Sequence, residues 1–306
     1  MPRSRWLACL FLVFLWSPLG LGARSVSLLS VGNSFSQNAH SYLAQLTEAA
    51  GHQIVLTNAV IGGCDFERHM RHADAYEADP SSSNGRPYYG GRSSLKELLC
   101  ARPWDLVTIQ QASPKSFKPE TYHPHVDRLI AYIRANAPGA EILIHETWAY
   151  RDDHAFFGLT NLNTDEMYRL VRAAYDGLAS ETGFRLIPSG DAFEAARRDP
   201  AWGRFLPDPT FDRKSAQAPT LPTAESRALH EGFAWKTNAR TQVAQLAFDG
   251  IHANRSGKYL LGCVWLESVF GVSAEGNSFL PAGMKAEDAA ILQRVAHRVV
   301  SEKRRP

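Results

Sequence analysis

The stretch Val31-Gly32-Asn33-Ser34-Phe35-Ser36 determines how the rest of this 306-residue chain is interpreted. It follows directly on the apolar run at residues 25–30, and apolar residues recur at helical spacing over residues 37–50. This order predicts a strand, a tight turn and a helix, with Ser34 at the turn. Open α/β sheets bind their ligands at the carboxyl ends of the strands, so Ser34 is placed where chemistry is expected.

The remaining chain continues this alternation of strands and helices. Because such strands pair in parallel through right-handed crossovers, the sequence predicts a three-layer α/β/α sandwich. Its sheet is expected to be mainly parallel, five-stranded and doubly wound, as in flavodoxin. Strand patterns occur at residues 53–60, 104–110, 141–146 and 184–188, and helical patterns at 66–73, 122–137, 165–180, 190–198, 256–270 and 286–300.

Residues 206–247 interrupt the alternation with Pro, Ala, Thr and Ser, and we expect an irregular segment there. A connection of this length inside a compact domain is usually functional or mobile. Since it immediately precedes Asp249 and His252, we expect a rim or lid over the site. A surface insertion without function is the alternative. We assign residues 24–306 to a single domain.

The N-terminus has the order of a secretory signal peptide. Arg3 and Arg5 precede an apolar run at residues 6–16, and small residues follow up to residue 23. The run is shorter than the roughly 20 apolar residues that span a bilayer. We therefore predict a signal peptide at residues 1–23 and a secreted or periplasmic mature protein without stable membrane insertion. An uncleaved membrane anchor is the alternative.

Net charge and cysteine content bear on the possible partners and on disulfide bonds. The formal net charge of +2 gives no reason to expect a nucleic-acid partner. Cys64, Cys100 and Cys263 would remain in the mature chain. Cys263 lies in an apolar helical pattern and is predicted to be a buried thiol, whereas pairing of Cys64 with Cys100 stays open.

A serine hydroxyl needs a positioned base before it becomes an effective nucleophile. The segment Asp249-Gly250-Ile251-His252 supplies a histidine and a carboxylate three residues apart. In such an arrangement the histidine takes the serine proton, and the carboxylate orients the imidazole. Ser34, His252 and Asp249 together therefore predict a nucleophilic hydrolase.

Four short blocks, in this order, resemble the SGNH or GDSL-type hydrolase superfamily of esterases and lipases. They are Gly32-Asn33-Ser34-Phe35, residues 58–63, residues 109–113 and residues 249–252. The first block has the Gly-Asn-Ser-Phe form of one bacterial branch instead of Gly-Asp-Ser. The resemblance covers most of the mature chain and implies an esterase that needs no cofactor.

The resemblance also assigns roles to individual residues. It implies that Ser34 is the nucleophile, His252 the general base and Asp249 its orienting carboxylate. It further implies that the N–H groups of Ser34 and Gly63 stabilise the oxyanion. Glycine suits this role because the backbone must approach the substrate without a Cβ atom in the way.

The third block departs from the pattern of the superfamily. Most members carry Gly-x-Asn-Asp there, and the asparagine amide donates to the oxyanion. Here Gln110 ends the strand, and its amide offers the same donor with one more methylene of reach. Gln111 and Ser113 remain alternatives for this donor. Gln111, Ser113 and Trp148 are also candidates for substrate contact, with aromatic packing as the alternative for Trp148.

The sequence thus predicts a secreted serine esterase that acts through an acyl-enzyme. The resemblance and the export signal favour O-acetyl groups on a carbohydrate as the substrate. An acyltransferase to an alcohol acceptor and a non-catalytic carbohydrate-binding protein are the alternatives. We predict no metal, because the histidine pairs at 69/72 and 123/125 lack carboxylates and cysteines in a recognisable arrangement.

Overall fold

A computed structural model of the protein describes residues 22–225 and 227–304. Almost all of the predicted signal peptide therefore lies outside the described residues. Within them, no helix combines the length and the apolar character needed to cross a bilayer.

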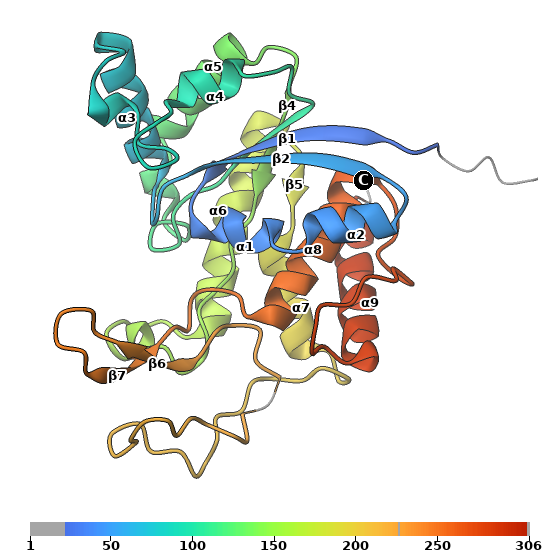
Figure 1. The fold of residues 1–306 in the computed structure, drawn as a ribbon. Helices are drawn as coiled ribbons and strands as arrows, with labels where there is room; N and C mark the ends of the chain where they lie inside the picture. The colour runs from blue at the N-terminus through green and yellow to red at the C-terminus, as the bar shows by residue number, and fades with distance from the viewer. Residues whose placement is uncertain (1–21, 226, 305–306) are drawn as a thin grey trace, which may run out of the picture.

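A parallel sheet of five strands forms the centre of the molecule (Figure 1). Its spatial order is β2-β1-β3-β4-β5, which confirms the predicted doubly wound sheet. The order reverses at β1, so the crevice at the carboxyl end of this strand is the expected ligand site. The strands are β1 (Ser25–Gly32), β2 (Gln53–Val60), β3 (Leu106–Ile109), β4 (Glu141–His145) and β5 (Leu186–Ile187).

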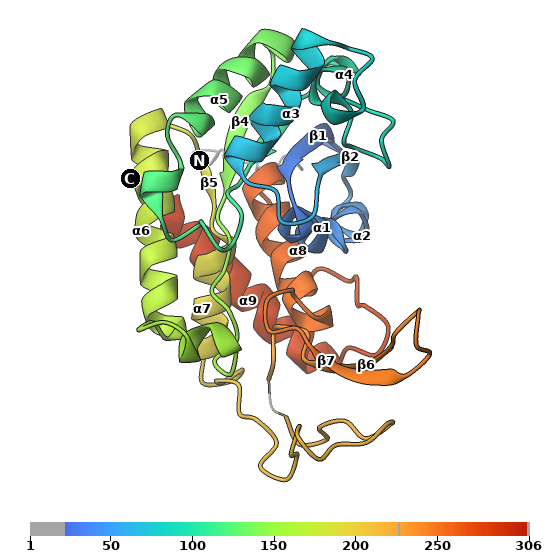
Figure 2. The ribbon, with the colours of Figure 1, turned by 90° about the vertical axis from the view of Figure 1, so that its left-hand side faces the viewer.

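Helices cover both faces of this sheet, as the predicted three-layer sandwich requires (Figure 2). Successive side chains of a strand point to opposite faces, so Leu28 packs in one core cluster and Leu29 in the other. The first face is covered by α1 (Ser34–His40), α2 (Leu43–Ala49), α7 (Ser189–Arg198), α8 (Arg255–Phe270) and α9 (Ala286–Lys303). The second is covered by α3 (Phe66–Ala78), α4 (Leu95–Cys100), α5 (His125–Asn136) and α6 (Thr164–Thr182).

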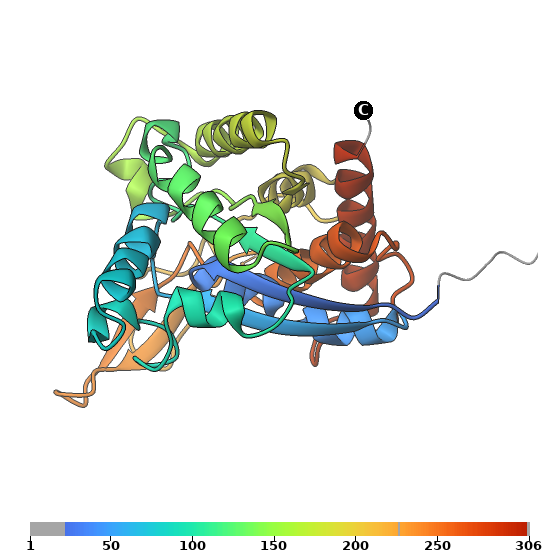
Figure 3. The same ribbon diagram turned by 90° about the horizontal axis from the view of Figure 1, so that it is seen from above.

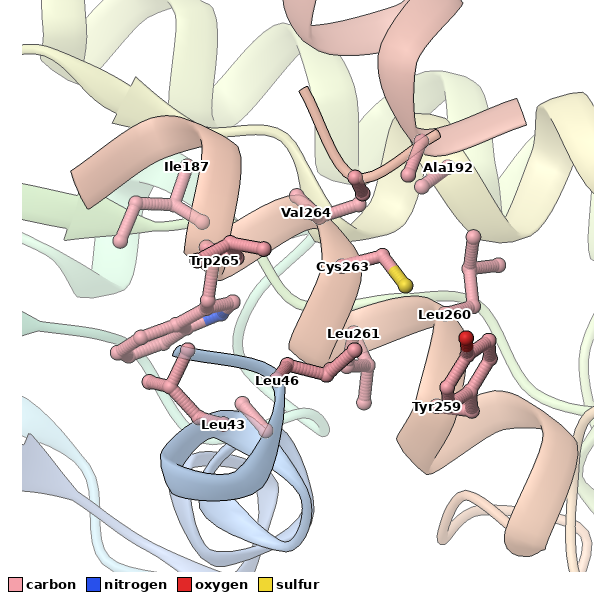
Figure 4. Close-up of a cluster of buried hydrophobic side chains, with 14 of the residues drawn as sticks. Leu43, Leu46, Ile187, Ala192, Tyr259, Leu260, Leu261, Cys263, Val264 and Trp265 are labelled. Atoms are coloured by element: carbon pink, nitrogen blue, oxygen red, sulfur yellow. The ribbon is translucent and has the colours of Figure 1, made fainter. Parts of the chain in front are cut away.

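Most residues of helix α8 are buried, and its side chains pack in one cluster with Leu43 and Leu46 of α2 (Figure 4). A Cβ atom on Gly262 would lie 2.6 Å from a methyl group of Leu46, so a glycine permits α2 and α8 to pack closely. Cys263 is fully buried, as predicted, and burial raises the pKa of its thiol well above the usual value. Because α8 begins just after His252, residues 249–252 are attached directly to a buried helix of the core.

The three cysteines of the described chain are free thiols. Cys64 is buried and Cys100 is exposed, so the pairing that the sequence left open is not formed.

Two segments differ from the prediction. The helix expected over residues 37–50 is divided into α1 and α2, and the Ser41 hydroxyl donates to the carbonyl of Gln37 at the end of α1. Such back-bonding by serine is associated with bends in helices. The segment expected to be irregular contains an antiparallel hairpin of β6 (Phe233–Thr237) and β7 (Ala244–Phe248). This hairpin projects from the body of the molecule in all three ribbon views (Figures 1–3).

Candidate active site

Ser34 lies where β1 passes directly into α1, at the first residue of the helix. Asn33 is the N-cap residue, and its side-chain oxygen accepts the N–H of Phe35 at 3.0 Å. The first N–H groups of a helix lack intrahelical partners. The Ser34 N–H is therefore available beside the Ser34 hydroxyl, and the side chain is only half-buried.

Asp249, His252 and Ser34 form a continuous chain of hydrogen bonds. His252 Nε2 lies 2.8 Å from Ser34 Oγ, and His252 Nδ1 lies 2.8 Å from Asp249 Oδ2. A carboxylate only accepts hydrogen bonds, so Nδ1 carries the proton and Nε2 is left to accept from the serine hydroxyl. The geometry brings together the three residues that the sequence predicted as the triad.

Asp249 is held in its ionised form. Partial burial alone would raise the pKa of this carboxyl group, but hydrogen bonds outweigh burial and keep the pKa well below its usual range. These bonds come from the His252 side chain and from the N–H groups of Ile251 and His252, the latter two on Oδ1 at 3.1 and 3.0 Å. One carboxylate oxygen thus fixes the turn and the other orients the imidazole.

The segment from Asp249 to Ala253 is fixed to several separate parts of the fold. Its backbone groups form hydrogen bonds with the body of the domain and with residues 231 and 232 of the 206–247 segment, so His252 is not on a free loop. The Gly250 carbonyl accepts from Arg151 N, the Ile251 carbonyl from Trp148 Nε1, and the His252 carbonyl from Glu231 N, while Asp249 N donates to Gly232 O and Ala253 N to Asn38 Oδ1.

Trp148 packs between the segment that carries Ser34 and the segment that carries His252, and it is not available to contact a substrate. Its indole stacks on Phe35, with ring centroids 4.0 Å apart, and donates to the carbonyl of Ile251 at 2.9 Å. Phe35 is next to Ser34, and Ile251 is next to His252. The side chain is 0% exposed, so we correct its assignment as a substrate contact. Packing, the alternative that the sequence left open, is what the structure shows.

The loop that carries Gly63 is joined to the turn at residues 32–34, which contains Ser34. Asn33 Nδ2 donates to the carbonyl of Cys64 at 2.9 Å, a bond that an aspartate at position 33 could not make. Gly63 is exposed and has a φ of +61°, a conformation that favours glycine. The loop therefore lies next to Ser34, and the oxyanion roles of Gly63 and of the Ser34 N–H stay predictions.

Gln110 contacts the turn at residues 32–34 and is 1% exposed. Its Nε2 donates to Asn33 Oδ1 at 2.8 Å, and its Oε1 accepts from His145 Nδ1 at 2.8 Å. Burial lowers the pKa of His145 to about 3, so this ring is neutral and donates through Nδ1. These bonds favour a supporting role for Gln110 over the predicted oxyanion contact, and Gly32 leaves the space that its side chain occupies.

The side chains of Gln111 and Ser113 also form hydrogen bonds within the protein. Gln111 is 0% exposed, its Oε1 accepts the N–H groups of Phe66 and Ala112, and its Nε2 donates to the carbonyl of Thr121. Ser113 is buried, with its hydroxyl 3.1 Å from that of Tyr150. The structure therefore does not place either side chain at an open surface where a substrate would contact it.

A Gln110→Ala variant tests whether Gln110 stabilises the turn around Asn33 or donates a hydrogen bond to the oxyanion. We expect the free energy of unfolding to fall by about 1–3 kcal/mol, because buried groups of Asn33 and His145 lose their partner. An oxyanion donor alone would instead lower kcat by about 10²–10³-fold with little change in stability. Urea unfolding and steady-state kinetics on the same variant decide between the two roles. Unchanged stability with a reduced kcat would restore the oxyanion assignment.

Arg151 anchors the segment between residues 206 and 247, and the sequence analysis did not identify it. Its side chain is 1% exposed and forms bidentate ion pairs with Asp153, at 2.7 and 2.8 Å, and with Glu225, at 3.2 Å to each oxygen. The guanidinium also lies over the rings of Phe205 and Phe248, 4.2 and 4.8 Å from their centroids. In the sequence, Arg151-Asp152-Asp153 has the composition of a solvated turn, so no signal pointed to this role.

A cavity of about 290 Å³ opens beside His252 and Asp249, and hairpin β6–β7 supplies most of its other walls. A larger cavity of about 420 Å³ lies between α6, α7 and α9. It contains none of the triad residues, and ion pairs of Arg172 and Arg198 with acidic neighbours occupy much of its lining. The smaller cavity is therefore the one that belongs to the site.

Two of the histidines that were weighed as metal ligands, His69 and His123, have other partners. His69 Nδ1 bonds the hydroxyl of Tyr88, and His123 bonds Asp127 and Glu181. Across the described residues, no group of three or more His, Cys, Asp and Glu side chains has an arrangement that would hold a metal ion.

Solved structures with the same fold include a DUF4886 family protein from Bacteroides uniformis. It is 25% identical, has a TM-score of 0.69, and the match covers 90% of this chain and 95% of that chain. A candidate SGNH hydrolase from Slackia heliotrinireducens is 20% identical, with a TM-score of 0.49 and coverage of 80% and 98%. An acetylxylan esterase from Geobacillus stearothermophilus is 11% identical, with a TM-score of 0.42 and coverage of 81% and 94%.

Structures similar to this chain thus include a DUF4886 protein and a protein named as a candidate SGNH hydrolase. No functionally curated protein matches the chain. The family described as a domain of unknown function, DUF4886, matches residues 27–201, which is more than half of the sequence and includes Ser34. The chain belongs to the DUF4886 family.

Proposed function

We propose that this protein is a serine esterase that hydrolyses a carboxylic ester through an acyl-enzyme. One observation carries the proposal: a half-buried serine hydroxyl, an imidazole and an ionised carboxylate are joined by two hydrogen bonds of 2.8 Å. A serine, a base and a group that orients the base are the parts that nucleophilic catalysis requires.

In the first half of the reaction, Ser34 Oγ attacks the ester carbonyl while His252 Nε2 takes the hydroxyl proton. Asp249 stabilises the resulting imidazolium through its bond to Nδ1. The N–H groups of Ser34 and Gly63 are the proposed donors to the oxyanion, and such a donor is worth about 3 kcal/mol. His252 then donates its proton to the leaving alkoxide, and the alcohol departs.

In the second half, water replaces the alcohol. His252 removes a proton from the water as its oxygen attacks the acyl carbonyl, and then returns the proton to Ser34 Oγ as the acid leaves. No step needs a cofactor. We propose an O-acetyl group on a carbohydrate as the substrate and a location outside the cytoplasm, on the basis of the signal-like N-terminus.

Labelling with a fluorophosphonate tests whether Ser34 is activated. We expect one adduct, located on Ser34 by mass mapping, and its loss in His252→Ala. Ser41→Ala is the matched control, because Ser41 is an exposed serine just beyond the same helix and should not affect labelling. Absence of an adduct on the folded wild-type protein would refute the proposed esterase and leave the carbohydrate-binding alternative.

A further inference from the structure

The cavity beside His252 is on the side of the site where the leaving alcohol must lie. His252 Nε2 must transfer its proton to the leaving oxygen, and such a transfer needs a separation of about 2.6–3.2 Å. The cavity is bounded by His252 and Asp249, whereas neither Ser34 nor Gly63 lines it. Given the proposed function, it therefore receives the alcohol part of the ester, and the acyl part lies towards Gly63.

Small side chains of the hairpin make room for this group. Ala234 on β6 pairs with Ala247 on β7, and both line the cavity. Lys236 is two residues beyond Ala234, on the same face of the strand, and also lines it. At about 290 Å³ the cavity is near the lower limit of small-molecule pockets, about 300–1,000 Å³, which suits a single sugar-sized unit.

A single lysine, Lys236, is among the residues that line this cavity. Between Gly232 and Phe248 the sequence has two charged residues, Lys236 and Arg240, and both are basic. Among the residues that the structure describes, no carboxylate pairs with Lys236. The two acidic residues of the cavity are already engaged, Glu231 by Lys258 at 2.9 Å and Asp249 by His252 at 2.8 Å. The Lys236 ammonium is thus left for a ligand.

We propose that the alcohol part of the substrate carries an anionic group, a carboxylate or a phosphate, which binds Lys236. The proposal rests on the proposed esterase function and defines the class of its substrate as an ester of an acidic sugar or a similar acidic alcohol.

Three acetyl esters with the same acyl group and sugar ring test the charge preference: those of methyl glucoside, methyl glucuronoside and methyl glucoside 6-phosphate. For the wild type we expect kcat/KM to be about two- to fivefold higher for one or both anionic esters, because solvent weakens an ion pair with an exposed lysine. Increasing salt should reduce this preference, because Lys236 is exposed. A higher rate for only one of the two distinguishes a carboxylate from a phosphate.

Two variants assign the preference to one side chain. Lys236→Met should remove it, whereas Arg240→Met should retain it, because Arg240 is an exposed basic residue of the same hairpin that does not line the cavity. Equal kcat/KM for neutral and anionic esters in the wild type would overturn the proposal. Retention of the preference in Lys236→Met would overturn it as well.

A binding measurement separates this proposal from the esterase function. In Ser34→Ala, calorimetry should show tighter binding of methyl glucuronoside or methyl glucoside 6-phosphate than of methyl glucoside, and Lys236→Met should abolish the difference. Turnover of p-nitrophenyl acetate without any anion preference would refute only the role of Lys236. Anion binding through Lys236 without turnover of any ester would refute only the esterase. Neither turnover nor anion binding would refute both.

Discussion

Replacing Ser34 by alanine is expected to lower kcat for an acetyl ester by about 10⁶-fold, because the loss of its nucleophile costs a serine hydrolase about that much in kcat. The reason is geometric, because the Ser34 hydroxyl is the atom that His252 Nε2 contacts at 2.8 Å. The measurement is steady-state turnover of p-nitrophenyl acetate and of an acetylated sugar. A Ser34→Ala enzyme within about tenfold of wild type would contradict a serine nucleophile.

Combined variants test whether Ser34, His252 and Asp249 act as one unit. Residues that act as one unit give effects that do not add. We therefore expect the double variant Ser34→Ala/His252→Ala to be about as slow as Ser34→Ala alone. Asp249→Asn should cost about 10⁴-fold, because an amide no longer holds the imidazole in the right tautomer. Ser41→Ala is the control, and thermal unfolding of each variant confirms that the fold is intact.

Local patterns were sufficient to predict the fold. The strand predicted at residues 53–60 is β2 with the same bounds, and a helix ending before Gly271 is observed as α8. Gly271 adopts a φ of +75°, the left-handed conformation that a glycine stop requires. These features depend on periodicity and on residues with distinctive backbone preferences, both of which are visible in a single sequence.

The sequence singled out Ser34, Asp249 and His252 through short blocks that resemble a known superfamily, and the structure places the three side chains together. Their catalytic roles stay predictions, and the residues that support them could not be predicted. The roles of Gln110 and Trp148 depend on which groups they contact after folding, and those partners are tens of residues or more away, such as Asn33 for Gln110 and Ile251 for Trp148. Residue type alone does not distinguish a buried amide that supports a turn from one that faces a substrate.

Hairpin β6–β7 was missed for a related reason. Its two strands are joined by residues 238–243, without the two-residue Asn-Gly or Asp-Gly turn that marks a hairpin in a sequence. Packing of Phe233 and Phe248, with ring centroids 4.8 Å apart, and the contacts of Arg151 hold the hairpin in place. Its stability thus comes from tertiary contacts that leave no periodic pattern.

An Arg151→Met variant is expected to lower the free energy of unfolding by about 3 kcal/mol, the lower end of the range for breaking a buried ion pair. Methionine retains much of the packing against Phe205 and Phe248 but leaves Asp153 and Glu225 without a cation. Those carboxylates are 29% and 20% exposed, so water offsets part of the loss. Urea unfolding measures the effect, and limited proteolysis tests whether the hairpin is released first.

Arg185→Met provides the matched control. Arg185 also forms a bidentate pair, with Glu141, but the two side chains are 51% and 48% exposed. We expect a cost of at most about 1 kcal/mol, because solvent screens exposed pairs. Similar losses for Arg151→Met and Arg185→Met would show that Arg151 does not anchor the segment.

Arg151 neutralises two carboxylates, and its ion cluster is also positioned to hold hairpin β6–β7 in place. A triple variant separates these two effects. In Arg151→Met/Asp153→Asn/Glu225→Gln no unpaired charge remains, so most of the stability should return, since replacing a whole ion cluster is often nearly neutral. Catalysis should recover less completely if the ion cluster places hairpin β6–β7, and with it Lys236 and Gly232, against the triad. Gly232 O accepts the N–H of Asp249, so a displaced hairpin would disturb the carboxylate that orients His252. Full recovery of both stability and kcat/KM would limit the role of Arg151 to the neutralisation of two carboxylates.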